Sequence, residues 1–424
     1  MIQFAEHIAV LLFILAYVFA MAYYNKKSFF VLASVVLLLF LGIMSPVEAF
    51  KAINWNVLGI YFGMLFISEL FIFSKIPDAI SIYFINKARK VSTVLILIAL
   101  FSGFISIAIE NVAVVFIVAP IALSVTRRLK ISPVPLLTAV AVSSNLQGVA
   151  TLIGDPPSML MAGFAKFTFN DFFFFNGKPS LFFAVQIGAL ASIIALYFVF
   201  RSYSNSHKKF REIKPTAIFP GILILLLIFA LAVSSSFDPE FRYLAGLLTV
   251  IFAIVALFWY AHSNTRDFLP MIRRVDWGTG FFLMGIFILV QSLIKVGFVE
   301  DIAKALSGFT HHSILLTFFI IIIVSLAFSA FIDNVPFIAA MLPVVKSIAL
   351  IINANPTLFY FGILIAASVG GNITPLGASA NIVAMGIAKK EGYKPKFLDF
   401  VKIGLPFTLI STAASCIFIY FFFA

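Results

Sequence analysis

Two short polar stretches interrupt long apolar segments and decide how this chain is built. Residues 143–158 read SSNLQGVATLIGDPPS, and residues 368–381 read SVGGNITPLGASAN. Proline cannot continue helical hydrogen bonding and glycine permits a reversal, so each stretch is predicted to break its helix. A broken helix leaves carbonyl and N–H groups free to bind ions. The alternative interpretation is a kink lined with small residues for close helix packing.

The two breaks belong to an internal duplication. Matching residues recur at an offset of 222 or 223: Trp55 and Trp277, Asn111 and Asn334, Pro120 and Pro343, Gly148 and Gly371, Thr151 and Thr374, Gly154 and Gly377. We expect a first repeat over residues 1–205 and a second over 206–424. Each half holds five apolar crossings, an odd number, so the second repeat is predicted to be inverted in the membrane. Inverted repeats with broken helices are typical of secondary transporters.

The composition excludes a soluble or disordered protein. Of the 424 residues, 62% are hydrophobic and 11% are charged, whereas soluble domains are roughly a quarter charged. A membrane-spanning helix needs about 20 apolar residues, which predicts an all-α polytopic membrane protein. The ten predicted crossings are 7–24, 29–45, 55–74, 134–165, 180–201, 216–235, 241–261, 277–295, 357–388 and 402–423. Of these, 134–165 and 357–388 are the helices predicted to be broken at the membrane midplane.

Two further apolar blocks are too long for one crossing. Residues 93–126 break at Glu110-Asn111, and residues 313–351 break at Asp333-Asn334. We interpret both as re-entrant hairpins, because irregular backbone at membrane depth must be covered by protein or line a water-filled cavity. The amphipathic stretches 77–90 and 298–308 precede the hairpins and are expected to lie flat on the membrane surface.

The net charge of +12 is explained by membrane orientation rather than by a nucleic-acid partner. With both termini outside, 22 of the 29 Lys and Arg residues, Lys27 among them, fall in loops on the inner side. Basic residues concentrate on the cytoplasmic side of membrane proteins. We therefore expect a multi-pass protein of the cytoplasmic (cell inner) membrane, in contact with the lipid bilayer.

Four acidic residues remain at membrane depth, and no Lys or Arg is expected to accompany them: Glu69, Glu110, Asp155 and Asp333. Buried carboxylates without basic partners imply bound cations, protons or helix N-termini. Glu69 is the exception, because its repeat counterpart is Gln291. An interhelical hydrogen bond explains that position better than transport does.

The hairpin tips are candidate sites for a small cation. Glu110 with Asn111, and Asp333 with Asn334, supply carboxylate and amide oxygens that suit Na⁺. The alternative is that these residues simply cap the second arm of each hairpin. Asp155 is equally consistent with a proton carrier and with the N-cap of the half-helix that follows it.

These segments resemble those of the arsenite-permease/sodium–proton-antiporter (ArsB/NhaD) family of the ion transporter superfamily, which also holds the P protein and citrate-transporter-like permeases. The motifs that carry the likeness are residues 333–335 (DNV), 151–157 (TLIGDPP), 377–381 (GASAN) and 397–400 (FLDF). The resemblance implies secondary transport, with ions bound between hairpin tips and broken helices, and relatives suggest a homodimer. Glu110, Gln147 and Pro375 depart from the usual Asp, Gly and Leu, which leaves the ion and its stoichiometry open.

The candidate residues divide by expected role. Those for the cation or proton are Glu110, Asn111, Asn145, Asp155, Asp333 and Asn334, with Na⁺ expected at the two hairpin tips. Those for the substrate are Thr151, Ser158, Asn372, Thr374, Ser379 and Asn381. No catalytic residues and no cofactor beyond Na⁺ or H⁺ as coupling ion are predicted, so the protein is not expected to be an enzyme. A soluble ATPase subunit is left open as a partner.

We expect a cation-coupled secondary transporter, driven by protons or sodium, that exports Na⁺ or a small inorganic species such as arsenite. The alternative is sodium-coupled uptake of a carboxylate or other small anion. Against it, neither hairpin tip carries the Ser-Asn-Thr of divalent-anion symporters, and no intramembrane Arg is available to hold a dianion. A passive channel is a third possibility, although the polar residues cluster at the repeat interface rather than along a continuous path.

Overall fold

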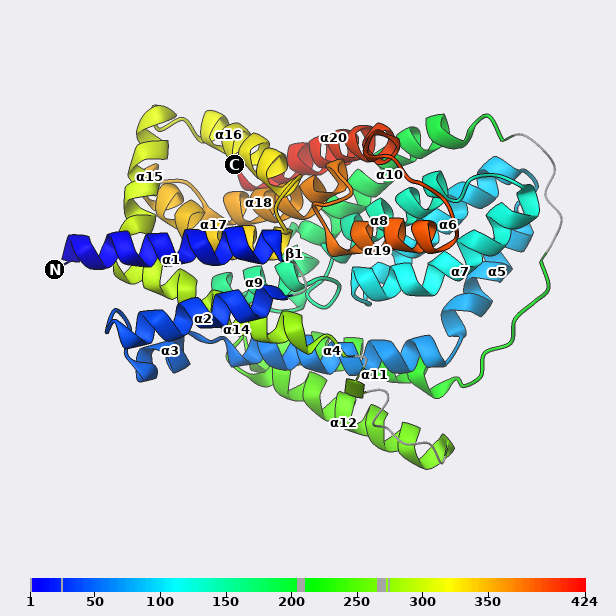
Figure 1. Ribbon diagram of the computed structural model, residues 1–424, viewed down its shortest axis with the longest axis horizontal. Coiled ribbons are helices and arrows are strands. Elements are labelled where there is room, and N and C mark those ends of the chain that lie inside the picture. The colour runs from blue at the N-terminus through cyan, green and yellow to red at the C-terminus, as the bar shows by residue number, and fades with distance from the viewer. Residues whose placement is uncertain (1, 24–25, 204–209, 265–271, 274) are drawn as a thin grey trace.

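The computed structural model describes residues 2–23, 26–203, 210–264, 272–273 and 275–424, and Figure 1 shows that most of them are helical. The predicted boundary between residues 205 and 206 lies outside the described residues, as do Lys208, Lys209, Arg266 and Arg274. The all-α, polytopic character predicted from the sequence is confirmed.

The elements of the first half, in chain order, are α1 (Ile2–Ala22), α2 (Lys27–Phe40), α3 (Pro46–Ala52), α4 (Trp55–Phe73), α5 (Ile76–Lys87), α6 (Val91–Ser106), α7 (Asn111–Leu129), α8 (Val134–Gly148), α9 (Pro156–Ala165), η2 (Asn170–Phe172), β1 (Phe174–Phe175), β2 (Lys178–Pro179) and α10 (Leu181–Phe200). Those of the second half are α11 (Phe219–Phe237), α12 (Leu244–Asn264), α14 (Trp277–Lys295), α15 (Phe298–Phe309), α16 (Ile314–Ser329), α17 (Asn334–Ile351), α18 (Pro356–Gly370), η3 (Gly371–Ile373), α19 (Ser379–Lys390) and α20 (Phe397–Phe423). The two strands form one short antiparallel pair.

The helix starts of the two halves recur at the offset found in the sequence. Each start from α4 to α9 is followed 222 or 223 residues later by the start of its counterpart from α14 to α19. In Figure 1 the short helix α5 lies toward one end of the bundle, and its counterpart α15 lies at the other end. The inverted membrane topology that this placement suggests stays a prediction, as does the location of both termini outside.

By length and composition, nine of the described helices could cross a membrane, or up to ten if α15 and α16 are counted as one bent span. This set differs in part from the ten crossings predicted above. The helices α1, α2 and α6 contain shorter apolar segments, whereas α7 and α17, which we expected to be hairpin arms, are long enough. The helices α15 and α16 meet at 119°, and the surface helices and re-entrant hairpins stay predictions.

Both predicted helix breaks are confirmed. The first separates α8 from α9 and the second separates α18 from α19. At the first break, a Cβ atom on Gly154 would lie 2.5 Å from the carbonyl oxygen of Gly148 and 2.7 Å from that of Ser106. Gly377 meets the corresponding carbonyls of the second half. Glycine is therefore required at both positions by the close approach of backbone segments.

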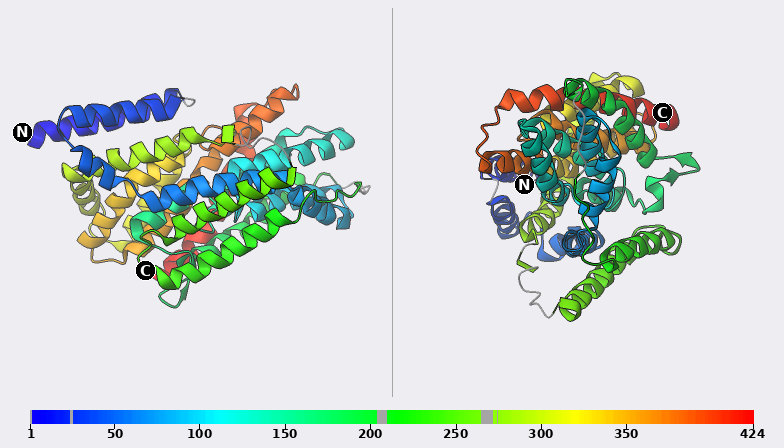
Figure 2. Two further views of the ribbon diagram at one scale, coloured as in Figure 1. Left: turned by 90° about the horizontal axis from the view of Figure 1, so that it is seen from below. Right: turned by 90° about the vertical axis from the view of Figure 1, so that its right-hand side faces the viewer.

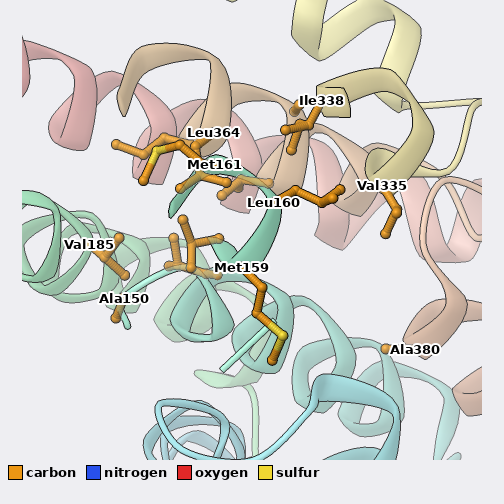
Figure 3. Close-up of a cluster of buried hydrophobic side chains, with 14 of the residues drawn as sticks. Ala150, Met159, Leu160, Met161, Val185, Val335, Ile338, Leu364 and Ala380 are labelled. Atoms are coloured by element: carbon orange, nitrogen blue, oxygen red, sulfur yellow. The ribbon is translucent and has the colours of Figure 1, made fainter. Parts of the chain in front are cut away.

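Two groups of helices pack mainly within themselves. The core group comprises α6 to α10 and α16 to α20, and the outer group comprises α1, α2, α4, α11, α12 and α14. Figures 1 and 2 show α12 at the edge of the bundle. Within the core group, Figure 3 shows Met159, Leu160 and Met161 of α9 in a buried apolar cluster with Val335 of α17 and residues of α18. This packing holds the half-helix after the first break against the second half.

We predict that Gly404→Ala destabilises the protein by about 2 kcal/mol or more, as expected for overpacking against rigid backbone. A methyl group at Gly404 of α20 would overlap the carbonyl oxygen of Asn372 in the second break. The matched control is Gly386→Ala in α19, where a methyl group meets no atom of the described residues. Thermal unfolding in detergent should show a lowered midpoint for the first variant alone, and equal midpoints would contradict this packing.

Candidate functional site

The acidic residues at the hairpin tips cap helices. Glu110 precedes α7, and its Oε2 accepts a hydrogen bond from the N–H of Ala113 at 3.0 Å. Asp333 precedes α17, and its Oδ1 accepts one from the N–H of Val335 at 3.2 Å. The capping alternative is therefore realised at both tips. Capping is not their whole environment, because both residues also line a cavity between the two halves.

Asp155 is the N-cap residue of the half-helix that follows it, α9, by position, but not through a side-chain hydrogen bond. Its Oδ1 instead accepts a hydrogen bond from Asn111 Nδ2 at 3.3 Å. Its Oδ2 is buried and accepts no hydrogen bond from any residue the structure describes. Asp155 is 2% exposed, so this oxygen is shielded from bulk solvent.

Buried asparagines connect the first hairpin tip to both breaks. Asn111 Nδ2 donates to Asn145 Oδ1 at 2.9 Å. Asn145 Nδ2 donates in turn to Asn372 Oδ1 at 2.7 Å and to Asn381 Oδ1 at 3.0 Å. Asn381 then donates to the carbonyl oxygens of Gly371 and Thr374 at 2.9 and 3.0 Å. Hydrogen-bonded amides thus fix the relative positions of the two broken helices.

Three predicted substrate residues use their hydroxyls to hold the breaks in place. Thr151 donates to the carbonyl oxygen of Ile107, and Thr374 makes the equivalent bond to Ala330 in the other half. Ser158 donates to the carbonyl oxygen of Val149 at 3.4 Å. Each threonine therefore ties a break to the end of the preceding hairpin arm.

A cavity of about 250 Å³ collects half of the predicted site residues. It is lined by the candidates Glu110, Asn111, Asp155, Asp333, Asn334 and Ser379. Its lining does not include the other candidates, Asn145, Thr151, Ser158, Asn372, Thr374 and Asn381, which form the frame behind it. The direct ion or substrate contacts predicted for this second set stay predictions.

Lys27 corrects the expectation that no basic residue accompanies the acids. We expected it in an inner loop, but it is the first residue of α2 and lines the same cavity. Its Nζ lies 3.6 Å from Asp333 Oδ2 and 5.1 Å from the centroid of the Phe282 ring. The side chains of Lys27 and Asp333 are 11% and 17% exposed. The sequence did not predict this ion pair, because the approach of Lys27 to Asp333 depends on how α2 packs.

Asp276 was also missed and is a fourth carboxylate lining the cavity. Its Oδ1 accepts a hydrogen bond from the N–H of Thr279 at 3.0 Å, which caps α14. The repeat could have found it, since Asn54 lies 222 residues earlier and caps α4 in the same way. Four carboxylates against one ammonium give the cavity a negative charge when all are ionised, which favours cations.

The residues that the structure describes contain no metal centre built from three or more His, Cys, Asp or Glu side chains. A Na⁺ ion bound by one or two carboxylates together with amide and carbonyl oxygens is compatible with that finding. Na⁺ binding at Glu110, Asn111, Asp333 and Asn334 stays a prediction.

Comparison with known proteins relates the chain to transporters. The sequence model of a family described as citrate transporter matches residues 16–361. An uncharacterized transporter of Mycobacterium bovis is 30% identical over 435 residues, covering 97% of each chain. The human P protein is 24% identical over 449 residues, which cover 86% of this chain and 53% of the P protein.

Two solved structures share the fold. The YdaH transporter of Alcanivorax borkumensis has a TM-score of 0.62 at 11% identity, covering 91% of this chain and 88% of its own. The MtrF protein of Neisseria gonorrhoeae has a TM-score of 0.58 at 14% identity, covering 91% and 83%. At these identities the likeness concerns the fold alone.

We predict that Asn145→Ala destabilises the protein by about 2 kcal/mol or more, because buried partners left without hydrogen bonds cost about 1–3 kcal/mol each. The change removes the bonds to Asn111, Asn372 and Asn381. Ser143→Ala, on the same helix, is the control, since the buried Ser143 hydroxyl has no partner among the described residues. Thermal unfolding should separate the two variants, and a stable Asn145→Ala protein would show that the amide network is dispensable.

Proposed function

Because the chain belongs to the citrate transporter family, we propose that it is a cation-coupled secondary active transporter. Membership in this family, together with the many long apolar helices, makes it a multi-pass membrane transporter. The coupling ion binds in the acidic cavity between the hairpin tips and the first broken helix. We assign the transporter to the cytoplasmic membrane, with a small ion as its substrate.

The Oδ2 atom of Asp155 carries this proposal. It is buried beside the cavity and accepts no hydrogen bond from the described residues. An ionised carboxylate in that position costs several kcal/mol unless a positive charge compensates it. A proton or a small cation supplies that compensation, so Asp155 binds one or the other.

Competition between the two species gives the coupling. When the cavity faces the side with more protons, Asp155 binds a proton and releases the cation. When the cavity faces the opposite side, the proton leaves and the cation binds again. Glu110 and Asp333, at the same cavity, contribute further oxygens. Exchange of this kind exports Na⁺ in return for protons, or exports a small inorganic species such as arsenite in return for protons or Na⁺.

One observation favours a second candidate function, the sodium-coupled uptake of a small carboxylate. Lys27 places an ammonium at the cavity, and an ammonium can pair with a substrate carboxylate. Exchange remains the better-supported function, because the described lining of the cavity contains four carboxylates and one ammonium.

Flux into proteoliposomes distinguishes the two functions. The panel comprises Na⁺, arsenite, sulfate, citrate and a dicarboxylate, each tested at two pH values. Exchange predicts Na⁺ or arsenite movement driven by an imposed pH gradient without any organic substrate. Uptake of labelled citrate or dicarboxylate that requires Na⁺ supports symport instead. Flux that neither saturates nor depends on a coupling gradient indicates a channel.

We predict that Asp155→Asn reduces gradient-driven flux about tenfold or more, since loss of one strong ionic contact of about 1.4 kcal/mol changes an equilibrium tenfold. The amide is nearly the same size but cannot exchange a proton or bind a cation as strongly. Asp301→Asn is the matched control, because Asp301 is 65% exposed on α15. Wild-type flux in a folded Asp155→Asn protein contradicts the proposal.

A further inference from the structure

The Lys27–Asp333 pair joins the two groups of helices at the cavity. Lys27 belongs to α2 of the outer group, which packs on α14, where Val31 lies against Gly285. The following helix, α3, is tied to the end of α14 by Lys295 Nζ, which donates to Glu48 Oε1 at 2.8 Å. The ammonium therefore projects from a well-anchored segment toward the core group.

Asp333 is held from the opposite side. Its Oδ1 caps α17, and its Oδ2 faces Lys27 Nζ at 3.6 Å. This separation lies within ion-pair range but beyond a good N–H···O hydrogen bond, for which about 2.7–3.2 Å is usual. Ionic attraction without a short hydrogen bond permits the ammonium to be displaced by another cation.

The duplication shows that this ammonium is specific to one half. Thr249 of α12 lies against Gly63 of α4 as Val31 lies against Gly285. Ala245 lies four residues before Thr249, as Lys27 lies four residues before Val31. Ala245 therefore occupies the position equivalent to Lys27. Ala245 is buried and uncharged. The cation beside the second hairpin tip therefore has no counterpart at the equivalent position beside the first.

We propose that the Lys27 ammonium is a built-in counter-cation of Asp333 that competes with the transported cation and sets the affinity of the site. This inference rests on the proposed function. An inorganic cation reaches Asp333 only by displacing Lys27 Nζ, so the ammonium lowers the apparent affinity of the whole cavity. Lys27 is thus a specificity-determining residue that the cation-binding candidates do not include.

The test measures Na⁺ binding to the full chain purified in detergent. NaCl replaces choline chloride at constant ionic strength, and the unfolding midpoint is followed because a ligand of the folded state raises it. In Lys27→Met, the Na⁺ concentration for the half-maximal shift should fall about tenfold, which corresponds to about 1.4 kcal/mol. Lys27→Arg, which keeps the charge, should respond as the wild type does.

The neighbouring lysine provides the matched control. Lys26 is exposed, so Lys26→Met removes the same charge from the adjacent position and should leave the Na⁺ response unchanged. The proposal is overturned if Lys27→Met responds to Na⁺ no more strongly than the wild type, including the case in which neither responds. It is also overturned if Lys26→Met gives the same gain, because the effect is then one of overall charge.

A double-mutant cycle tests the pair without any added cation. Lys27→Met and Asp333→Asn each remove one partner of the same ion pair, so their combination should lose less stability than the sum of the single losses. Additive losses overturn the pairing. Asp155→Asn in the Lys27→Met background separates the two proposals: if the Na⁺ response persists, the role of Asp155 fails while competition by Lys27 stands.

Discussion

Burying carboxylates in a largely apolar molecule is the physical constraint on which the centre of this structure depends. Of the four that line the cavity, Asp155 is buried, Glu110 and Asp333 are partly buried, and Asp276 is exposed. Glu110 and Asp276 accept backbone hydrogen bonds as helix caps, and Asp333 combines a cap with the Lys27 ammonium. Asp155 receives one side-chain amide and no positive charge among the described side chains. Asp155 Oδ2 is therefore the oxygen that most needs a compensating positive charge. A proton or mobile cation bound there would stabilise the carboxylate most.

The backbone contacts around Asp155 recur in the second half of the chain, but its acidic side chain does not. Thr151 and Thr374 make the same hydrogen bond in each half, and Gly154 and Gly377 make the same close approach. The residue 223 positions after Asp155, however, is Ala378. A repeated frame lets both halves adopt equivalent conformations, as alternating access requires. In the proposed exchange, the single acidic residue would keep the ion at one place while those conformations alternate.

The elements of the fold were predictable because their signals are local. Prolines and glycines mark the breaks, apolar length marks the helices, and polar pairs mark the starts of α7 and α17. The site was predictable only in part, because the sequence does not say which polar residues face the cavity and which form its frame. Asn145 belongs to the frame through its three amide partners. Lys27 was missed because its approach to Asp333 depends on the packing of α2 against α14, which no local pattern encodes.

Exchange and symport lead to the same requirement at Asp333. A cation that binds there must displace the Lys27 ammonium, because Nζ lies 3.6 Å from Oδ2, the oxygen of Asp333 that does not cap α17. A substrate carboxylate that pairs with Lys27 must likewise draw the ammonium away from Asp333. The aspartate is then a largely buried anion without a partner, which is costly unless an inorganic cation takes the place of the ammonium. Anion uptake through this cavity would therefore be coupled to a cation by the same residue pair, and the two functions differ only in which partner Lys27 acquires once it is released.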